Sequence, residues 1–191
     1  MDEHIPAIVN AWYPGEQGGT AVADVLFGDY NPAGRLPLTY YKSLDELPPF
    51  DDYDITKGRT YKYFKGDVLY PFGYGLSYSS FKYSDLKVKD STDKVTESFR
   101  LKNTGRRKGD EVAQVYVRIP ETGGIVPIKE LKGFERIFLR KGESREVKFI
   151  ITAADLKFYN SELQYLYEPG EFDVMVGPNS RDVQTKRFKA E

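Results

Sequence analysis

The chain has 191 residues, enough for one ordinary domain or for a small domain with an additional piece. Its net charge of −1 gives no electrostatic reason to expect a nucleic acid as partner, and no stretch has the roughly 20 apolar residues that a membrane helix needs. Cysteine is absent, which excludes disulfides and thiolate metal sites but leaves the compartment open. Aromatic residues make up 15% of the chain and favour pleated, half-buried surfaces, so we expect mainly β structure.

Residues 1–40 have the pattern of a strand, a turn, a helix, a second turn and a second strand. The first strand is predicted from the apolar run Ile5, Ala7, Ile8 and Val9. The helix is predicted from one apolar face and a glycine that suits its C-terminal cap: Ala21, Val22, Val25, Leu26 and Gly28. "NPAG" at 31–34 is typical of a turn. A piece of this size cannot cover a parallel strand, so we interpret it as an incomplete end of a larger α/β domain.

Residues 41–80 form a long irregular connector that is rich in Tyr, Pro and Gly. It contains "DELPPFDDYD", "GRTYKYF" and "YPFGYGLSY". Irregular chain of this length usually marks a functional loop or a connection between domains. Its flat faces and hydroxyls would suit a sugar ring: Tyr53, Arg59, Tyr61, Tyr63, Tyr70, Tyr74 and Tyr78. The simpler alternative is that these side chains only pack the connector against its neighbours.

Residues 81–191 read as a series of alternating strands separated by turns. The inward-facing sets are Val95, Phe99 and Leu101; Ala113, Val115, Val117 and Ile119; Val147, Phe149 and Ile151; Phe172, Val174 and Val176. The turn signals are "NTGRRKGD", which we interpret as a hairpin, "RKGE", "EPGE" and "GPNS". This pattern predicts a fibronectin type III or immunoglobulin-like β-sandwich, and the lack of a Cys pair favours the fibronectin-like version. We expect this span to fold on its own.

Glu16 lies in a Gly-rich stretch and is the first candidate for chemistry. As a general acid for glycoside hydrolysis it would need a second carboxylate nearby, and the sequence does not fix the geometry of Asp24 or Asp29. We interpret Glu16 as an acid in the first helical turn, and Gly18 and Gly19 as allowing the helix to approach the preceding strand. The stretch lacks the spacing of a P-loop or of a dinucleotide fingerprint.

The remaining charged candidates favour structural roles. His4 is the only histidine, so no histidine pair exists for a metal. The acidic cluster lacks the glycine and glutamate of an EF-hand loop and is interpreted as solvated; it consists of Asp51, Asp52 and Asp54. Arg106, Arg107 and Lys108 are interpreted as a solvated hairpin tip. We therefore expect no metal and no cofactor.

Several strings, in order along the chain, resemble the C-terminal part of glycoside hydrolase family 3 of β-glucosidases and β-xylosidases. They are "AWYPGEQGGTAVADVLFGDYNPAGRLPLTYY", "GRTYKYF", "LYPFGYGLSYSSF", "NTGRRKGDEVAQVYV", "ELKGFERIFLRKGES" and "EPGEFDVMVG". The resemblance implies a (β/α) barrel, an α/β sandwich domain and a fibronectin type III-like domain. Residues 1–40 would be the C-terminal remnant of the α/β sandwich domain, 41–80 the connector, and 81–191 the fibronectin-like domain.

The resemblance also implies a function. The parent would be a retaining exo-acting β-glycosidase acting on terminal β-linked sugars, with both catalytic carboxylates upstream of Met1 and Glu16 as scaffold. The N-terminus is no signal peptide, although a periplasmic or secreted parent would fit. Arg59, Tyr61 and Tyr63 would form the rim of the parent's substrate site, with both tyrosines on one side if the chain is extended there. The alternative is a free-standing, non-catalytic module that binds glycan or protein.

Overall fold

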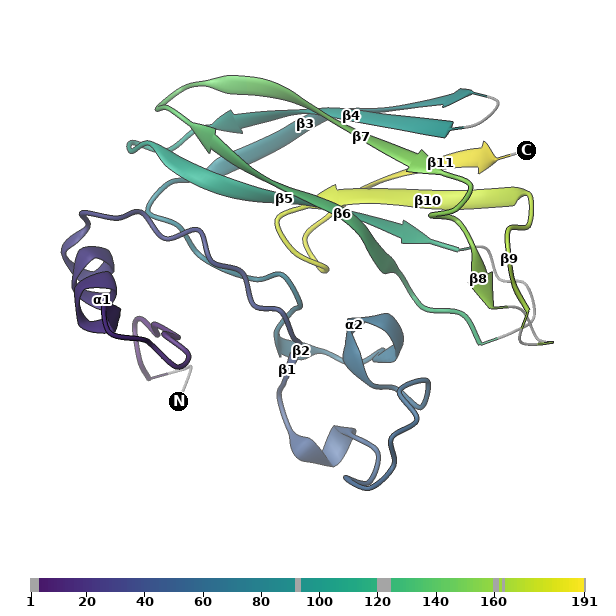
Figure 1. Ribbon diagram of the computed structural model, residues 1–191, viewed down its shortest axis with the longest axis horizontal. Coiled ribbons are helices and arrows are strands. Elements are labelled where there is room, and N and C mark those ends of the chain that lie inside the picture. The colour runs from purple at the N-terminus through teal and green to yellow at the C-terminus, as the bar shows by residue number, and fades with distance from the viewer. Residues whose placement is uncertain (1–3, 92–93, 120–124, 160–161, 163, 191) are drawn as a thin grey trace.

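The centre of the computed structural model is a β-sandwich of two antiparallel sheets (Figure 1). The structure describes residues 4–91, 94–119, 125–159, 162 and 164–190. One sheet has the order β3–β4–β7 and the other the order β11–β10–β5–β6. Their bounds are β3 (Phe81–Ser91), β4 (Lys94–Asn103), β7 (Ser144–Thr152), β5 (Gly109–Arg118), β6 (Glu130–Leu139), β10 (Gly170–Gly177) and β11 (Gln184–Ala190). This confirms the predicted fibronectin type III-like class.

The core lies between the two sheets and is built from the side chains that the alternation pattern selects. Val95, Phe99 and Leu101 of β4 are buried, whereas Arg100 between them is exposed. The predicted sets on β5, β7 and β10 join them, with Phe149 only partly buried. A short hairpin, β8 (Phe158–Tyr159) with β9 (Tyr165–Leu166), adds Phe158 to the core.

The segment 104–108 is not a hairpin, contrary to the prediction. It joins β4 to β5, and these two strands belong to different sheets. The chain therefore crosses from one layer of the sandwich to the other at this point. A sequence shows that two strands alternate but not which sheet each joins, so a turn between sheets resembles a hairpin turn.

The N-terminal part differs from its prediction in both strands and in the second turn. Residues 5–9 form no strand and are exposed, because they have no neighbouring strand to pair with. The helix α1 (Gly18–Phe27) forms as predicted and ends at Gly28, whose φ of 83° is left-handed. Residues 31–34 have no assigned turn, and only Tyr40 of the predicted second strand is in a strand, β1 (Tyr40–Tyr41). In this part of the chain, no residue of α1 is buried.

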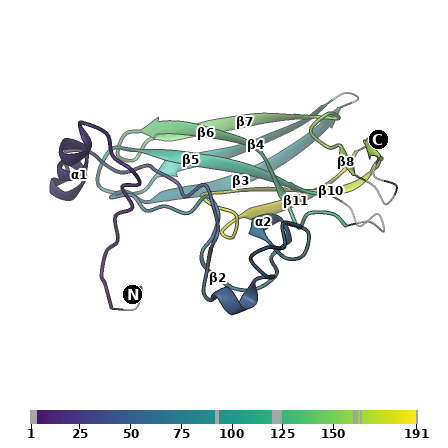
Figure 2. The same cartoon turned by 60° about the horizontal axis from the view of Figure 1, so that its bottom comes forward.

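Part of the connector forms a loop that begins and ends at one two-stranded sheet, and we call this loop the connector excursion. Strand β1 (Tyr40–Tyr41) pairs with β2 (Val68–Tyr70), so residues 42–67 begin and end at the same place. This excursion contains the 3-10 helix η1 (Leu44–Glu46) and the four-residue helix α2 (Thr60–Tyr63). Figures 1 and 2 both show it beneath the sandwich. Among the described residues, no helix has the length and apolar character to cross a membrane.

Candidate functional site: the junction of connector and sandwich

The connector packs on the outer face of the four-stranded sheet at Gln114 and Tyr116 of β5. The ring of Tyr61 stacks on Phe72 with 4.3 Å between centroids and meets the edge of Tyr116 at 5.9 Å. The Gln114 amide donates to the carbonyls of Gly73, at 3.1 Å, and Pro178. Strand β5 is therefore buried on both faces, although its sequence alternates as if one face were open. Connector and sheet form one packed unit.

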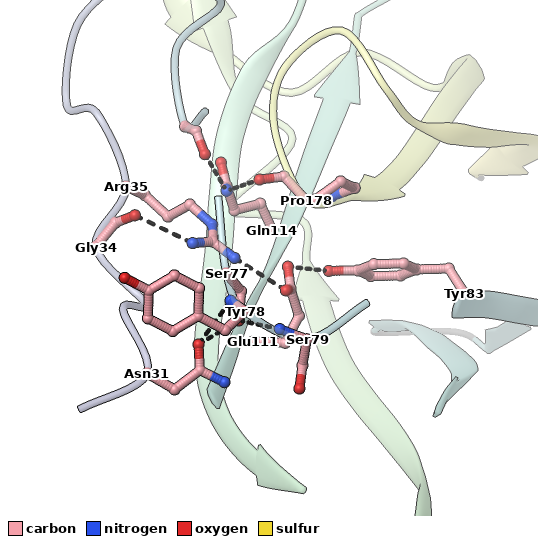
Figure 3. A network of polar contacts seen from close by, with 11 residues as sticks. Asn31, Gly34, Arg35, Ser77, Tyr78, Ser79, Tyr83, Glu111, Gln114 and Pro178 are labelled. Carbon is pink, nitrogen blue, oxygen red and sulfur yellow. Dashed lines mark hydrogen bonds and ion pairs between the residues drawn. The ribbon is translucent and has the colours of Figure 1, made fainter. Parts of the chain in front are cut away.

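A buried polar network joins the N-terminal part to both sheets (Figure 3). The Arg35 guanidinium donates to Glu111 at 2.9 Å, and the Tyr83 hydroxyl donates to the other oxygen of the same carboxylate at 2.9 Å. The side chains of Arg35 and Glu111 are only 9% and 3% exposed. Burial raises the pKa of Glu111, while Arg35 and the Tyr83 hydroxyl oppose that rise. A buried ion pair of this kind is costly to break from one side.

Asn31 attaches the same segment to the start of the sandwich, and Figure 3 shows it below Arg35. Its side-chain oxygen accepts from the Ser77 hydroxyl at 2.9 Å and from the Tyr78 amide at 2.8 Å. Its side-chain nitrogen donates to the Lys108 carbonyl at 2.9 Å. Asn31 therefore spans three segments instead of starting the predicted turn.

Arg59 braces the connector excursion from inside. Its guanidinium donates to the carbonyls of Pro48, at 3.1 Å, and Pro49, at 2.6 Å. The next residue, Thr60, has a φ of 60°, and its amide donates to the Tyr41 hydroxyl at 2.7 Å. A β-branched residue in the left-handed region is strained. Such a conformation persists only where surrounding contacts fix the backbone, and it is most frequent at functional sites.

The segment after Arg59 is helical, so the extended arrangement predicted for Tyr61 and Tyr63 is wrong. Residues two apart on a helix point in different directions. Tyr61 points into the junction and its hydroxyl accepts from the Leu131 amide at 3.1 Å, whereas Tyr63 is half-buried. Lys62, between the two tyrosines, pairs with Glu130 at 2.6 Å. Helix α2 is thus attached to the start of β6.

A pocket opens where the connector meets the sandwich, with a volume of about 510 Å³. Connector and sandwich both line it: Thr39, Tyr61, Phe64, Lys65, Gly66, Asp67, Val68, Pro71, Ile128, Lys129, Ser180 and Arg181. Tyr61 is the only one of the three predicted rim residues among these lining residues.

The other sequence candidates lie apart from this junction. Glu16 is exposed and precedes the helix, whose cap is Gln17, so the interpretation as a first-turn acid is wrong. Gly18 is in close contact with Pro14, where a Cβ would lie 2.3 Å from the proline Cβ, while Gly19 faces open space; neither packs on a strand. Asp24 is half-buried on α1; His4 and Asp29 are exposed.

The acidic cluster at 51–54 and the basic cluster at 106–108 both make contacts within the chain. Lys57 pairs with Asp52 at 2.7 Å, and the Thr56 hydroxyl donates to Asp54 at 2.6 Å. These bonds, together with backbone amides two residues on, keep the pKa of both carboxyls below its usual value. Arg107 is exposed but not merely solvated, because it donates to the Gly28 carbonyl at 3.2 Å and lies over the Tyr78 ring. In the described part of the chain, no cluster of potential metal ligands occurs.

The buried charges of the molecule were not predicted. Arg35 and Glu111 are far apart in sequence, and only the packing of two segments brings them together. Glu97 occupies an inward position of β4, between Val95 and Phe99, so the alternation pattern itself carried the signal. Its side chain is fully buried and neither oxygen has a hydrogen-bond partner among the described residues. Burial raises the pKa of Glu97 to about 8.

Comparisons with known proteins agree with this architecture. The glycosyl hydrolase family 3 C-terminal domain matches residues 1–78, and a fibronectin type III-like domain matches residues 111–180. The chain belongs to glycoside hydrolase family 3 and corresponds to the C-terminal part of its members.

Two relatives and one solved structure show the extent of the likeness. A xylan 1,4-beta-xylosidase of Xylanibacter ruminicola is 43% identical over 97% of this chain and 22% of its own length. A periplasmic beta-glucosidase of Salmonella typhimurium is 40% identical over 98% of this chain and 26% of its own. Beta-glucosidase 3B of Thermotoga neapolitana, solved with glucose, has a TM-score of 0.86 and 38% identity over 94% of this chain and 28% of its own. The chain thus spans about a quarter of these proteins.

Proposed function

We propose that this chain is the C-terminal, non-catalytic part of a retaining exo-acting β-glycosidase that hydrolyses terminal β-linked xylosides or glucosides. The xylosidase and glucosidase relatives support the reaction class. Retaining hydrolysis uses two carboxylates roughly 5 Å apart. The acidic side chains with shifted pKa values have structural settings instead: Glu97 in the core, Glu111 in the buried network, Glu130 beside α2, and Asp52 and Asp54 in their loop.

The ion pair between Arg35 and Glu111 is the observation that carries the scaffold role. Arg35 lies in the region that matches the family 3 C-terminal domain, and Glu111 begins the region that matches the fibronectin type III-like domain. The sandwich therefore holds the end of the α/β domain in a fixed position. We propose that α1 and the segment before it pack on the remainder of that domain, since their large apolar side chains are exposed here: Ile5, Ile8, Val9, Trp12, Tyr13, Leu26 and Phe27.

We also propose that Arg59, Tyr61 and Tyr63 belong to the rim of the parent's substrate site and that they have different roles there. Arg59 and Tyr61 hold the excursion, because their polar groups already bind protein partners. Tyr63 stays half-exposed and is the member free to approach a sugar. Phe50 and Tyr53 are exposed on the loop that Arg59 braces.

A chimaera with the X. ruminicola xylosidase tests the scaffold role. The C-terminal region of that relative would be replaced by this chain, which is 43% identical to it. We expect the chimaera to hydrolyse an aryl β-xyloside, and the relative truncated before this region to be inactive. A chimaera that carries only residues 81–191 is the control and should also be inactive, because it lacks the end of the α/β domain.

Two results would contradict the proposal. A chimaera that folds but does not hydrolyse the xyloside would contradict the scaffold role. Detectable affinity of the isolated chain for xylo- or gluco-oligosaccharides, together with an inactive chimaera, would favour the free-standing glycan-binding module.

A further inference from the structure

We propose that the pocket between the connector and the sandwich binds a small carboxylate with an apolar body. The pocket has a volume of about 510 Å³, within the roughly 300–1,000 Å³ of ordinary small-molecule sites. Its two sides come from elements that the junction holds together, α2 and the β10–β11 turn among them. The pocket is therefore preformed.

The charges at the pocket favour an anion. Lys65, Lys129 and Arg181 contribute three cations, and Asp67 contributes the one carboxylate among the lining residues. That carboxylate is already paired with Lys42 at 3.1 Å. The described residues contain no ion-pair partner for Lys65, and Arg181 reaches only its exposed neighbour Asp182 at 3.5 Å.

Two lining residues have polar groups that are buried and incompletely satisfied. Lys129 is half-buried, donates to the Ser180 carbonyl, and its pKa is lowered by burial and by the nearby charge of Arg118. A negative charge nearby would offset both effects, because it favours the charged form of the lysine. Thr39 is 9% exposed, and its hydroxyl oxygen is buried without a hydrogen-bond partner in the described part of the chain. Such a group is costly unless a ligand or water satisfies it.

The apolar residues that line the pocket indicate that the uncharged part of the ligand is apolar. Apolar surface comes from Tyr61, Phe64, Val68, Pro71 and Ile128. A sugar would leave its hydroxyls facing this surface, whereas an aryl or alkyl group would bury apolar area there. The combination fits an apolar body that ends in a carboxylate.

Titration calorimetry on the whole chain with 3-phenylpropanoate, and with the neutral 3-phenylpropanamide, tests the site. We expect the carboxylate to bind in the micromolar to millimolar range and the amide at least about tenfold more weakly. Lys65→Gln and Arg181→Gln should each weaken binding of the carboxylate by about three- to fivefold, the size of an exposed ion pair. Added salt should weaken it further.

Thr39→Val separates a ligand contact from a packing role. It removes the unpartnered hydroxyl without changing the shape, so we expect affinity to fall while the melting temperature stays equal or rises. Lys141→Gln is the matched control, because Lys141 lies beyond the far end of β6 from Lys129 and should not change binding. No binding at millimolar concentration, or equal affinity for acid and amide, would overturn the proposal.

Discussion

At the residue scale, Glu97 and Glu111 are two of the buried carboxyls of the described residues, and their surroundings differ. Glu111 has the Arg35 guanidinium and the Tyr83 hydroxyl as partners, so its burial is compensated. Glu97 has no partner among the described residues, and the rise of its pKa to about 8 comes from burial alone. Glu111 therefore links two segments of the chain, whereas Glu97 makes the stability of the core depend on pH.

Glu97 should make the sandwich less stable as the pH rises. Its folded pKa of about 8 lies above the unfolded value of 4.5, so its contribution is largest below pH 4.5 and is lost as the pH rises through about 8. The upper bound is roughly 5 kcal/mol, from about 1.4 kcal/mol for each pH unit between 4.5 and about 8. Urea unfolding at several pH values should show this fall in the free energy of unfolding.

Glu97→Gln should flatten that profile. A smaller slope should remain, because burial also raises the pKa of Glu111. Glu146→Gln is the control: Glu146 is exposed on the neighbouring strand β7, and its loss should leave the slope unchanged. An unchanged slope in Glu97→Gln would contradict the burial of this carboxyl in the core.

Breaking the ion pair between Arg35 and Glu111 from one side should be costly. Arg35→Met leaves a buried carboxylate without its counter-charge, so we expect a loss of about 3 kcal/mol in the free energy of unfolding. The double variant Arg35→Met with Glu111→Leu should recover most of that loss. A double-mutant cycle measured by urea unfolding would show the coupling, and additive effects of the two substitutions would contradict it.

The outcome at these residues shows what a sequence supplies. Alternation along β4, β5 and β10 predicted the core correctly, because the period of a strand fixes which side chains share a face. Arg35 and Asn31 could not be predicted, because their partners lie 76 and 46 residues away and only packing brings them together. The predicted strand at residues 5–9 does not form, because a strand needs a neighbouring strand to pair with.

At the element scale, the connector excursion combines rigidity with exposed aromatic side chains. Arg59 binds two carbonyls of the loop, and the strained Thr60 is tied to Tyr41. In the active chimaera, Arg59→Ala should lower kcat/KM for glycosides by about tenfold, roughly 1.4 kcal/mol, because the rim would lose its geometry. Lys57→Ala, in the same turn but on an exposed ion pair, is the control. Unaltered kinetics with a lowered melting temperature would restrict Arg59 to packing.

Helix α1 and the segment before it should make the isolated chain self-associate. Leu26 is 62% exposed and Phe27 84% exposed, and such contiguous apolar surface promotes association. We expect light scattering to show oligomers of the full chain. Removing residues 1–28 should abolish them while keeping Asn31 and Arg35 in place. A strictly monomeric full chain at high concentration would show that this surface is no interaction face.

At the scale of the whole molecule, the sandwich should fold without the connector but with lower stability. The two sheets enclose their own core, so residues 81–191 should unfold in one cooperative urea transition. The midpoint should be lower than that of the full chain, because Tyr116 and Gln114 lose the cover of Tyr61 and Gly73. The absence of a cooperative transition would mean that the connector belongs to the folding unit.

The central claim is that this chain supports a glycosidase without carrying its catalytic groups, and hydrolysis by the purified chain tests it most directly. Release of nitrophenol from aryl β-xyloside and β-glucoside should equal that of a buffer control, while the chimaera turns the xyloside over under the same conditions. Addition of a chelator should change neither result. Turnover by the chain alone that survives repurification would contradict the claim.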